Sequence, residues 1–198
     1  MIIAANILNS ISQTYHSMAS PSKETAVLRL ILENSPLREW RFEELVKESK
    51  TTKAVTNKWI KKYLRMGVFA KVKQKGKYPH YTVGNNNPSY YALKRKYVLE
   101  QLFDSGLIQQ LLSLQQAKTV IIFGSITRGD WYKDSDIDIF ILGSAQGLSK
   151  QRFEQKLQRP IELHIFENKK EIYNVKTGLV QNVLNGYLVK GQIQDILA

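Results

Sequence analysis

The spacing of apolar side chains changes character along this chain. Between residues 23 and 66 they recur every three or four positions, which is the spacing of one face of an α-helix. Residues 90–116 continue in a mostly helical pattern. Beyond residue 116 the apolar residues gather in short continuous or alternating runs, which are typical of buried and half-buried strands, and surface helices are predicted at residues 150–158 and 177–184. The pattern therefore predicts an α+β protein with helices in its first half and a small mixed sheet, flanked by helices, in its second.

The first half is predicted to contain three helices and a hairpin. The helices are expected at residues 23–34, 41–49 and 53–66. Gly67 ends the third helix, because glycine readily adopts the left-handed conformation found there. Residues 69–74 and 78–83 then form two predicted strands around a turn at Lys75-Gly76-Lys77. Three helices followed by a two-stranded hairpin resemble a winged helix-turn-helix, whose third helix enters the major groove and whose wing touches phosphates.

Positive charge is concentrated in the same half. The chain has a formal net charge of +12, and residues 1–100 hold 18 Lys and Arg against 7 Asp and Glu. Residues 50–77 carry ten Lys or Arg and no acidic residue. Charge distributed in this way is expected where one part of a protein meets a polyanion. The first half is therefore predicted to bind nucleic acid, with double-stranded DNA as the leading ligand; RNA and an ordinary solvated basic face are the alternatives.

The side chains expected nearest the DNA lie on the third helix and the wing. They are Thr51, Thr52, Lys53, Thr56, Asn57, Lys58, Lys61, Lys62, Lys73, Lys75 and Lys77. Asparagine and lysine can read base edges, whereas most of these lysines are expected to contact phosphates only.

The most informative chemistry lies between residues 120 and 143. An apolar run ends at Gly124-Ser125, a short polar segment follows, and Asp136-Ile137-Asp138 opens a second apolar run. Side chains two positions apart in a strand share a face, so the two aspartates point the same way. Adjacent carboxylates repel each other unless a cation lies between them, and their oxygens suit Mg²⁺. The glycine lets backbone N–H groups approach a phosphate closely.

These motifs resemble a known family. Gly-Ser followed, after ten residues, by Asp-x-Asp is the signature of DNA polymerase beta-like nucleotidyltransferases. Arg128-Gly129-Asp130 and the run at residues 134–138 are similar to the small, minimal nucleotidyltransferase branch. The resemblance covers residues 118–190, less than half of the chain. The alternative is a hairpin whose exposed face carries solvated aspartates.

The family uses a third carboxylate on a neighbouring strand, and the candidate here is Glu162. It lies in the alternating run of residues 161–166, which places Glu162 and His164 on one face. A glutamate stands where the family usually has an aspartate, and its extra methylene changes the reach of the carboxylate. Glu162 would bind a second metal or act as general base on the attacking hydroxyl. His164 is a rival for the role of base, although a histidine beside a strand is more often a surface or supporting residue.

The resemblance also assigns the remaining roles in the site. Nucleotide binding falls to Gly124, Ser125 and Arg128, and catalysis and metal binding fall to Asp136, Asp138 and Glu162. Ser125 would donate its hydroxyl to a phosphate. Arg128 would clamp the triphosphate or pair with Asp130 or Asp134, which are otherwise typical of turns and caps. The metal, Mg²⁺ or Mn²⁺, would neutralise the triphosphate and activate the acceptor hydroxyl.

The resemblance implies an enzyme that transfers a nucleoside monophosphate from a nucleoside triphosphate to a hydroxyl acceptor. Acceptors in the family are nucleic-acid ends, small molecules and hydroxyls of partner proteins. Minimal members often accompany a HEPN-type protein in toxin–antitoxin pairs, and here such a partner would be a separate chain. The alternative function is a DNA-binding transcriptional regulator or antitoxin-like protein whose transferase-like domain senses nucleotide or binds a partner without turnover.

The predictions divide the chain into three parts. Residues 1–84 form the winged helix-turn-helix domain, 85–116 a helical connector and 117–198 the nucleotidyltransferase domain. The connector is expected to pack across both domains, with Tyr90-Tyr91 as an anchor. Residues 1–20 lack the charged start of a signal peptide and are predicted to form an extra helix or a dimer-forming arm. No apolar run approaches the ~18 residues that span a bilayer, so we expect a cytoplasmic protein. The absence of cysteine excludes disulfides and thiolate chemistry.

Overall fold

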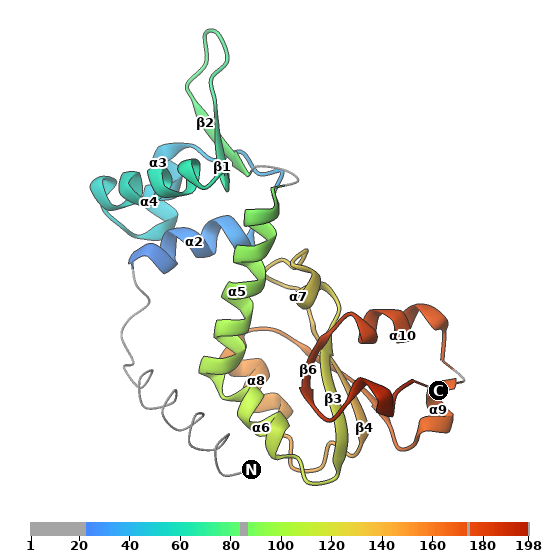
Figure 1. Ribbon diagram of the computed structural model, residues 1–198. Helices are drawn as coiled ribbons and strands as arrows, with labels where there is room; N and C mark the ends of the chain where they lie inside the picture. Colours follow the sequence, from blue (N-terminus) through green and yellow to red (C-terminus); the bar gives the residue numbers. More distant parts are fainter. Residues whose placement is uncertain (1–22, 84–86, 174, 198) are drawn as a thin grey trace.

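The computed structural model describes residues 23–83, 87–173 and 175–197. The arm or helix predicted for residues 1–20 lies outside these ranges. The described part consists of a helical unit with a β-hairpin, a long helix α5, and a second unit built on a four-stranded sheet (Figure 1). None of the helices in the described ranges is both long enough and apolar enough to cross a membrane.

The first unit contains the three predicted helices and the two predicted strands. Its elements are α2 (Lys23–Glu33), α3 (Phe42–Ser49), α4 (Lys53–Arg65), β1 (Phe69–Val72) and β2 (His80–Val83). The strands pair antiparallel with Phe69 opposite Val83, and the hairpin projects away from the helices (Figure 1). Each strand is shorter than predicted, because pairing stops before the lysine-rich tip. Thr52 caps α4 by accepting a hydrogen bond from the Val55 N–H.

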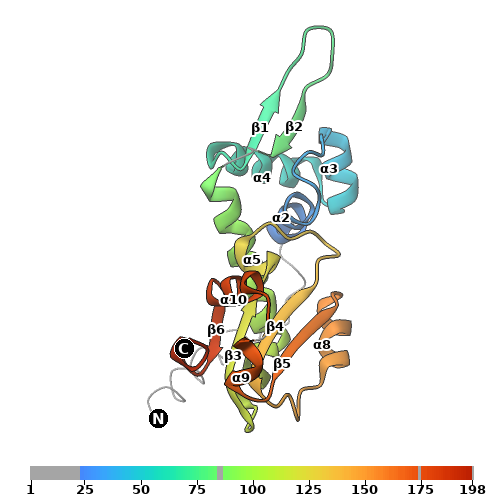
Figure 2. The same cartoon turned by 90° about the vertical axis from the view of Figure 1, so that its right-hand side faces the viewer.

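Helix α5 (Pro88–Ser105) joins the two units, and α6 (Leu107–Ser113) follows it directly. Gly106 adopts a φ of 85° and serves both as the C-cap of α5 and as the start of α6. The Tyr97 ring stacks on Trp131 of the second unit with 6.0 Å between centroids, while its hydroxyl donates to Glu33 of α2. Figure 2 shows α5 between the hairpin-bearing unit and the sheet. The connector therefore contacts both halves, as predicted.

The second unit is a mixed sheet with strand order β5-β4-β3-β6. The strands are β3 (Ala117–Phe123), β4 (Ile137–Gly143), β5 (Ile161–Phe166) and β6 (Tyr187–Lys190). Strands β4 and β5 run parallel, and the other two pairs are antiparallel. The accompanying helices are α7 (Ser125–Arg128), α8 (Lys150–Leu157), α9 (Lys169–Tyr173), α10 (Thr177–Leu184) and η1 (Ile193–Asp195). The α+β class and the mixed sheet agree with the prediction, whereas α9 and η1 were not expected.

The two faces of the sheet pack against different helices. On one face the fully buried Ile122, Ile137 and Ile139 belong to a core shared with α5, α6 and α8. On the other, Phe123 and Phe140 pack with residues of α9 and α10. Burial of each such side chain contributes about 1.5 to 3 kcal/mol to stability. Because alternate residues of a strand share a face, Asp138 lies on the same face as Phe140, at the end of the second core.

Candidate functional site

The turn between β3 and α7 forms one wall of the site. Gly124 has a φ of 79° and a ψ of −150°, a conformation that residues with a side chain rarely adopt. A Cβ atom at this position would lie 2.1 Å from Oδ2 of Asp138. Buried Ile126 anchors α7, and Thr127 donates its hydroxyl to the Gly124 carbonyl. The turn therefore brings the backbone directly against the Asp138 carboxylate.

Strand register brings the carboxylates together. Asp138 lies opposite Phe123 on β3 and opposite Glu162 on the parallel strand β5. Its side chain is half-buried, while that of Glu162 is 58% exposed. Asp136 precedes β4 and is exposed. The sheet thus supplies two of the three predicted carboxylates from adjacent strands and presents the third at the mouth of the site.

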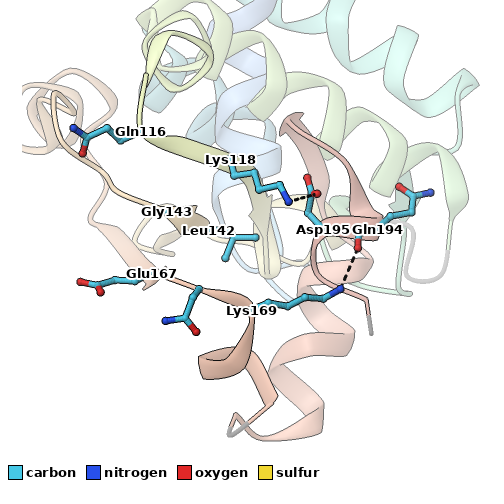
Figure 3. Close-up of a pocket in the computed structure, with 9 residues that line it drawn as sticks. Gln116, Lys118, Leu142, Gly143, Glu167, Lys169, Gln194 and Asp195 are labelled. Atoms are coloured by element: carbon cyan, nitrogen blue, oxygen red, sulfur yellow. Dashed lines mark hydrogen bonds and ion pairs between the residues drawn. The ribbon is translucent and has the colours of Figure 1, made fainter.

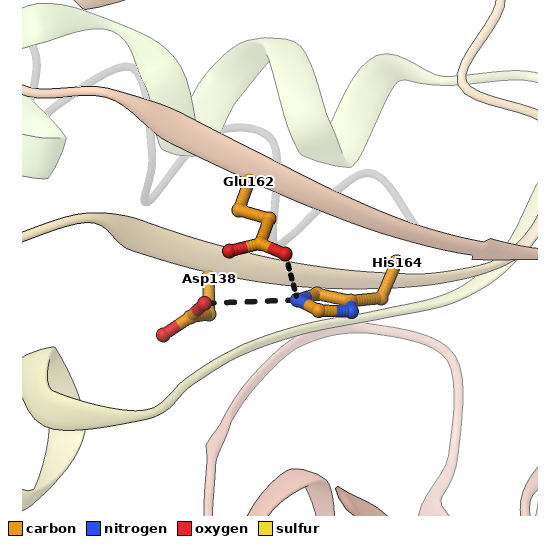
Figure 4. Close-up of side chains that lie close together, drawn as sticks. All are labelled: Asp138, Glu162 and His164. Carbon is orange, nitrogen blue, oxygen red and sulfur yellow. Dashed lines mark ion pairs between the residues drawn. The ribbon is translucent and has the colours of Figure 1, made fainter. Parts of the chain in front are cut away.

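The group of donors that forms in the structure includes the histidine. Nε2 of His164 lies 3.6 Å from Oδ1 of Asp138 and 3.7 Å from Oε1 of Glu162 (Figure 4). One donor atom from each of these three residues lies within 4.8 Å of the others. The sequence pointed to Asp136 as the partner of this pair. In the structure His164 takes that place, and Asp136 lies close enough to influence the Asp138 charge.

Like charges and burial make an anionic Asp138 unfavourable. Burial raises the pKa of its carboxyl, and the nearby Glu162 and Asp136 raise it further, whereas His164 lowers it. A cation placed among these groups would reverse that balance, because it stabilises the ionised carboxylates. The electrostatics of the site therefore favour binding of a positive ion.

A pocket of about 460 Å³ opens between the turn and the carboxylates. It is lined by Phe123, Gly124, Ser125, Arg128, Asp134, Ser135, Asp136, Asp138, His164, Leu179 and Asn182. All predicted nucleotide-binding residues and both aspartates line it, whereas Glu162 does not. Leu179 and Asn182 come from α10, which the sequence predicted as a helix without any signal that placed it at the site.

Arg128 adopts the second of its two predicted arrangements. Its Nε lies 3.0 Å from Oδ2 of Asp130, and both side chains are half exposed. An exposed pair of this kind contributes little to stability, so the guanidinium is available to exchange partners. Arg128 therefore lies at the rim of the pocket as a positive charge that a phosphate can recruit.

A second pocket, of about 370 Å³, lies at the opposite end of β3 and β4 (Figure 3). Asp195 lines this pocket. Its carboxylate lies 2.8 Å from Nζ of Lys118 and accepts a hydrogen bond from the Thr119 hydroxyl, also at 2.8 Å. These contacts lower the pKa of Asp195. The predicted site residues all belong to the described part of the chain, and none of them lines this pocket. It is consequently distinct from the candidate site.

The predicted DNA-contacting residues divide into exposed and buried ones. Thr52, Lys53, Asn57, Lys58, Lys61, Lys73, Lys75 and Lys77 are exposed, and Thr51 and Lys62 are half-buried. Thr56 is fully buried, and its hydroxyl is 2.6 Å from that of Thr51. Its predicted contact with DNA is therefore wrong: the residue holds the start of α4 to the segment before it.

Two of the predicted lysines are already paired. Lys53 lies 2.8 Å from Glu43 of α3, and Lys62 lies 2.6 Å from Glu24 of α2. Within the described ranges no ion pair is found for Lys58 or Lys61, nor for the wing lysines. Several positive charges without an ion-pair partner in these ranges therefore lie on the exposed side of α4 and along the hairpin.

A family model matches most of the second half of the chain. Residues 105–188 match the family model of the nucleotidyltransferase domain. This part of the chain therefore carries a nucleotidyltransferase domain, which agrees with the predicted resemblance, and the match spans less than half of the chain. The match begins within the end of α5 and runs into β6, so it contains the whole candidate site.

Two solved structures are similar to the chain at a lower level. A toxin–antitoxin with AMP-PNP is 21% identical over 52% of this chain and 77% of its own, with a TM-score of 0.31. A mutant of the toxin–antitoxin MntA-HpeT is 18% identical over 52% of this chain and 76% of its own, with a TM-score of 0.30. No curated protein matches the chain.

Proposed function

We propose that this protein transfers a nucleoside monophosphate from a nucleoside triphosphate to a hydroxyl acceptor, with a divalent cation in the site. The observation that carries the proposal is the approach of the Gly124 backbone to Asp138 within the nucleotidyltransferase domain. It puts a turn suited to phosphate beside the cation-binding side chains Asp138 and His164 in the lining of one pocket. That arrangement suits phosphoryl chemistry, in which catalysis is mostly positioning and electrostatics.

Different side chains of the pocket would contact different parts of the nucleotide. Ser125, at the start of α7, is placed to donate its hydroxyl to a phosphate oxygen. Arg128 would leave Asp130 for the more highly charged triphosphate. Leu179 of α10 offers an apolar surface on the far side of the same pocket. Together these groups would fix the triphosphate so that its α-phosphate faces the carboxylates.

The donors present fit a divalent cation. Asp138 and Glu162 offer oxygens from adjacent strands, Asp136 adds another at the mouth, and His164 has a buried Nε2 with no hydrogen-bond partner in the described ranges. When bound there, a cation neutralises charge on the triphosphate and makes the acceptor hydroxyl easier to deprotonate. The side chains of the site would hold the cation and orient the triphosphate. Glu162, the more exposed of the two strand carboxylates, is the candidate base.

We also propose that the first unit is a winged helix-turn-helix that binds double-stranded DNA and locates the enzyme. The support is the order of its elements, the exposed lysines on α4 and the hairpin, and the concentration of charge in residues 50–77. Lysines on such surfaces contact phosphates and make binding dependent on salt. A separate protein partner and a dimer through residues 1–20 stay predictions from the sequence.

The proposed transfer is tested by comparing wild type with the double variant Asp136→Asn/Asp138→Asn. We expect wild type to be stabilised by nucleoside triphosphate only when Mg²⁺ or Mn²⁺ is present, by about 2.7 kcal/mol at a hundred times the dissociation constant. The double variant should lose both this stabilisation and the release of pyrophosphate, and keep DNA binding. Equal transfer by the two proteins would refute the enzyme assignment, and metal-dependent nucleotide binding without turnover would favour the nucleotide-sensing regulator.

A further inference from the structure

We propose that His164 is a ligand of the catalytic cation, and that its imidazole makes the site select a divalent transition ion over Mg²⁺. The inference rests on the proposed function, since it concerns the metal of the same site. It assigns metal binding to a residue that the sequence analysis treated as a rival base or as a surface or supporting residue.

The position of the imidazole nitrogen is the first argument. Nε2 is buried, has no hydrogen-bond partner among the described residues, and lies 3.6 and 3.7 Å from oxygens of Asp138 and Glu162. These separations are too long for hydrogen bonds. Two donors that each lie about 2.0 to 2.2 Å from one ion are about 3.0 to 3.5 Å apart. The imidazole nitrogen thus stands within a few tenths of an ångström of that spacing from each carboxylate, and all three donors lie within 4.8 Å of one another (Figure 4).

The surrounding strands hold the ring in this orientation. His164 lies opposite Phe140 in the parallel pair β4–β5, two residues after Glu162 lies opposite Asp138. Phe123 of β3 packs against the imidazole, with 5.1 Å between ring centroids and 58° between planes. Because three adjacent strands fix the ring and the two carboxylates, the donors are preorganised rather than gathered by chance on a flexible surface.

Neither of two simpler roles accounts for this arrangement. In an ion pair with Asp138 alone, a protonated imidazole would approach one oxygen to about 2.8 Å, whereas Nε2 stands nearly midway between oxygens of two residues. A general base would direct its nitrogen at the acceptor hydroxyl, whereas Nε2 is directed at two carboxylates. A cation shared by the three donors explains both the equal separations and the missing hydrogen bond.

The donor set determines which ions suit the site. Mg²⁺ prefers oxygen ligands in rigid octahedral geometry and keeps several waters. An imidazole nitrogen binds first-row transition ions better than it binds Mg²⁺, and affinity rises along that series from Mn²⁺. A site with two carboxylates and one imidazole should therefore bind Mn²⁺ more tightly than Mg²⁺, and the preference should depend on His164.

The test measures Mn²⁺ binding by electron paramagnetic resonance, without nucleotide or turnover. Wild type is compared with His164→Gln, with His164→Asp and with the matched controls His80→Gln and His16→Gln, which change the other two histidines of the chain. Half-buried His80 lies on β2 beside Glu39, far from the site in sequence and structure. We expect spin-echo modulation from a directly bound nitrogen in wild type and in both controls, and its loss in His164→Gln.

Affinities give the second readout. His164→Gln should weaken Mn²⁺ binding at least tenfold, and His164→Asp should bring the Mn²⁺ and Mg²⁺ affinities closer together by restoring an oxygen ligand. The inference is overturned if wild type shows no nitrogen coupling, or if His164→Gln binds Mn²⁺ as wild type does. In either case the proposed transferase function is retained if the Asp136→Asn/Asp138→Asn double variant loses pyrophosphate release. Turnover by that variant equal to wild type would refute both the transferase function and the role of His164 as a ligand of its cation.

Discussion

At the scale of single residues, the site depends on the contact between Gly124 and Asp138. The glycine combines a left-handed φ with a separation that leaves no room for a Cβ atom. The Gly-Ser motif identified this residue from the sequence. The reason why a glycine is required there depends on the packing of β4 beside the turn. A glycine in a Gly-Ser pair is common, whereas here the missing side chain of Gly124 leaves the space that the Asp138 carboxylate occupies.

Gly124→Ala should therefore abolish metal-dependent stabilisation by nucleoside triphosphate. The added methyl group would meet Oδ2 of Asp138 at 2.1 Å and displace the carboxylate, besides the conformational cost of about 1 to 3 kcal/mol. Gly147→Ala is the matched control, because Gly147 has a φ of 93° but nothing lies within 4 Å of the position that its Cβ atom would take. Thermal-shift titrations of both variants would show this: a nucleotide response in Gly124→Ala equal to that of Gly147→Ala would contradict the packing argument.

Lys94 of α5 offers a second prediction at this scale, on stability. It is 1% exposed, donates to the Trp131 carbonyl and lies 4.5 Å from the centroid of the Trp131 ring. Burial lowers its pKa to about 8, with Asp130 opposing that shift and Arg159 adding to it. Between pH 8 and 10.5 the unfolded chain binds a proton that the folded chain has released, so the free energy of unfolding rises with pH.

We expect the free energy of unfolding to increase by about 1 to 2 kcal/mol from roughly pH 7.5 to 9.5 through this group. Lys94→Met keeps the length of the side chain and should remove the increase. Denaturant unfolding at several pH values provides the measurement, and it stops below about pH 10 because burial raises the pKa of Tyr90 and Tyr97, which acts in the opposite direction. An increase that persists in Lys94→Met would assign it to another group.

At the scale of elements, the sequence predicted the helices that have a visible apolar period and missed two short ones. The helices α2, α3, α4 and α10 lie within one residue or two of their predicted bounds, because each has apolar residues at helical spacing. Helix α9 and η1 are too short for a period to be visible. Thr56 shows the limit of charge-based reasoning: it lies amid basic residues, yet its hydroxyl bonds with Thr51 in the interior. Helix α10 was found, but its place beside the pocket depends on tertiary packing.

The outer side of α4 carries a prediction about DNA. Lys58 and Lys61 are exposed and have no ion-pair partner in the described ranges. Changing each to alanine should weaken DNA binding and reduce the slope of log K against log salt by about one per lost phosphate contact. Lys150→Ala is the control, because Lys150 lies on α8 of the other unit and pairs with Glu154 at 3.6 Å. Fluorescence anisotropy at several salt concentrations measures the slope, and an unchanged slope for Lys58→Ala/Lys61→Ala would remove α4 from the interface.

At the scale of the whole molecule, one tryptophan attaches the second unit to α5. Trp131 is fully buried between the Tyr97 ring, Lys94 and Arg159, whose guanidinium lies 4.7 Å from the ring centroid. Two residues later the Lys133 N–H donates to the carbonyl of Glu33 at the end of α2. The segment between the Gly-Ser turn and Asp136 is thus attached to both α5 and α2. No pattern in the sequence indicated this attachment, since a single tryptophan in a polar stretch has no periodic context.

Trp131→Ala should lower the free energy of unfolding by about 3 to 5 kcal/mol, through the lost apolar burial and the cavity left behind. We also expect wild type to unfold in one calorimetric transition, and the variant to show two, because the shared core between the units is broken. Trp59, half-buried on α4, provides the control Trp59→Ala, which should lower stability without separating the transitions. A single transition in Trp131→Ala would show that other contacts suffice to couple the units.

The pairing of β4 with β5 has a consequence for how this chain can fail. Asp138 faces Glu162, and Phe140 faces His164, in a parallel ladder on an edge strand. If β5 slipped by one position, Glu162 and His164 would turn toward the opposite core and Leu163 would take their place. Such a molecule would keep nearly all of its hydrogen bonds and remain compact, yet it would lack Glu162 and His164 in the site and be inactive. Activity per folded molecule is therefore a more sensitive report on correct assembly of this sheet than any measure of secondary structure.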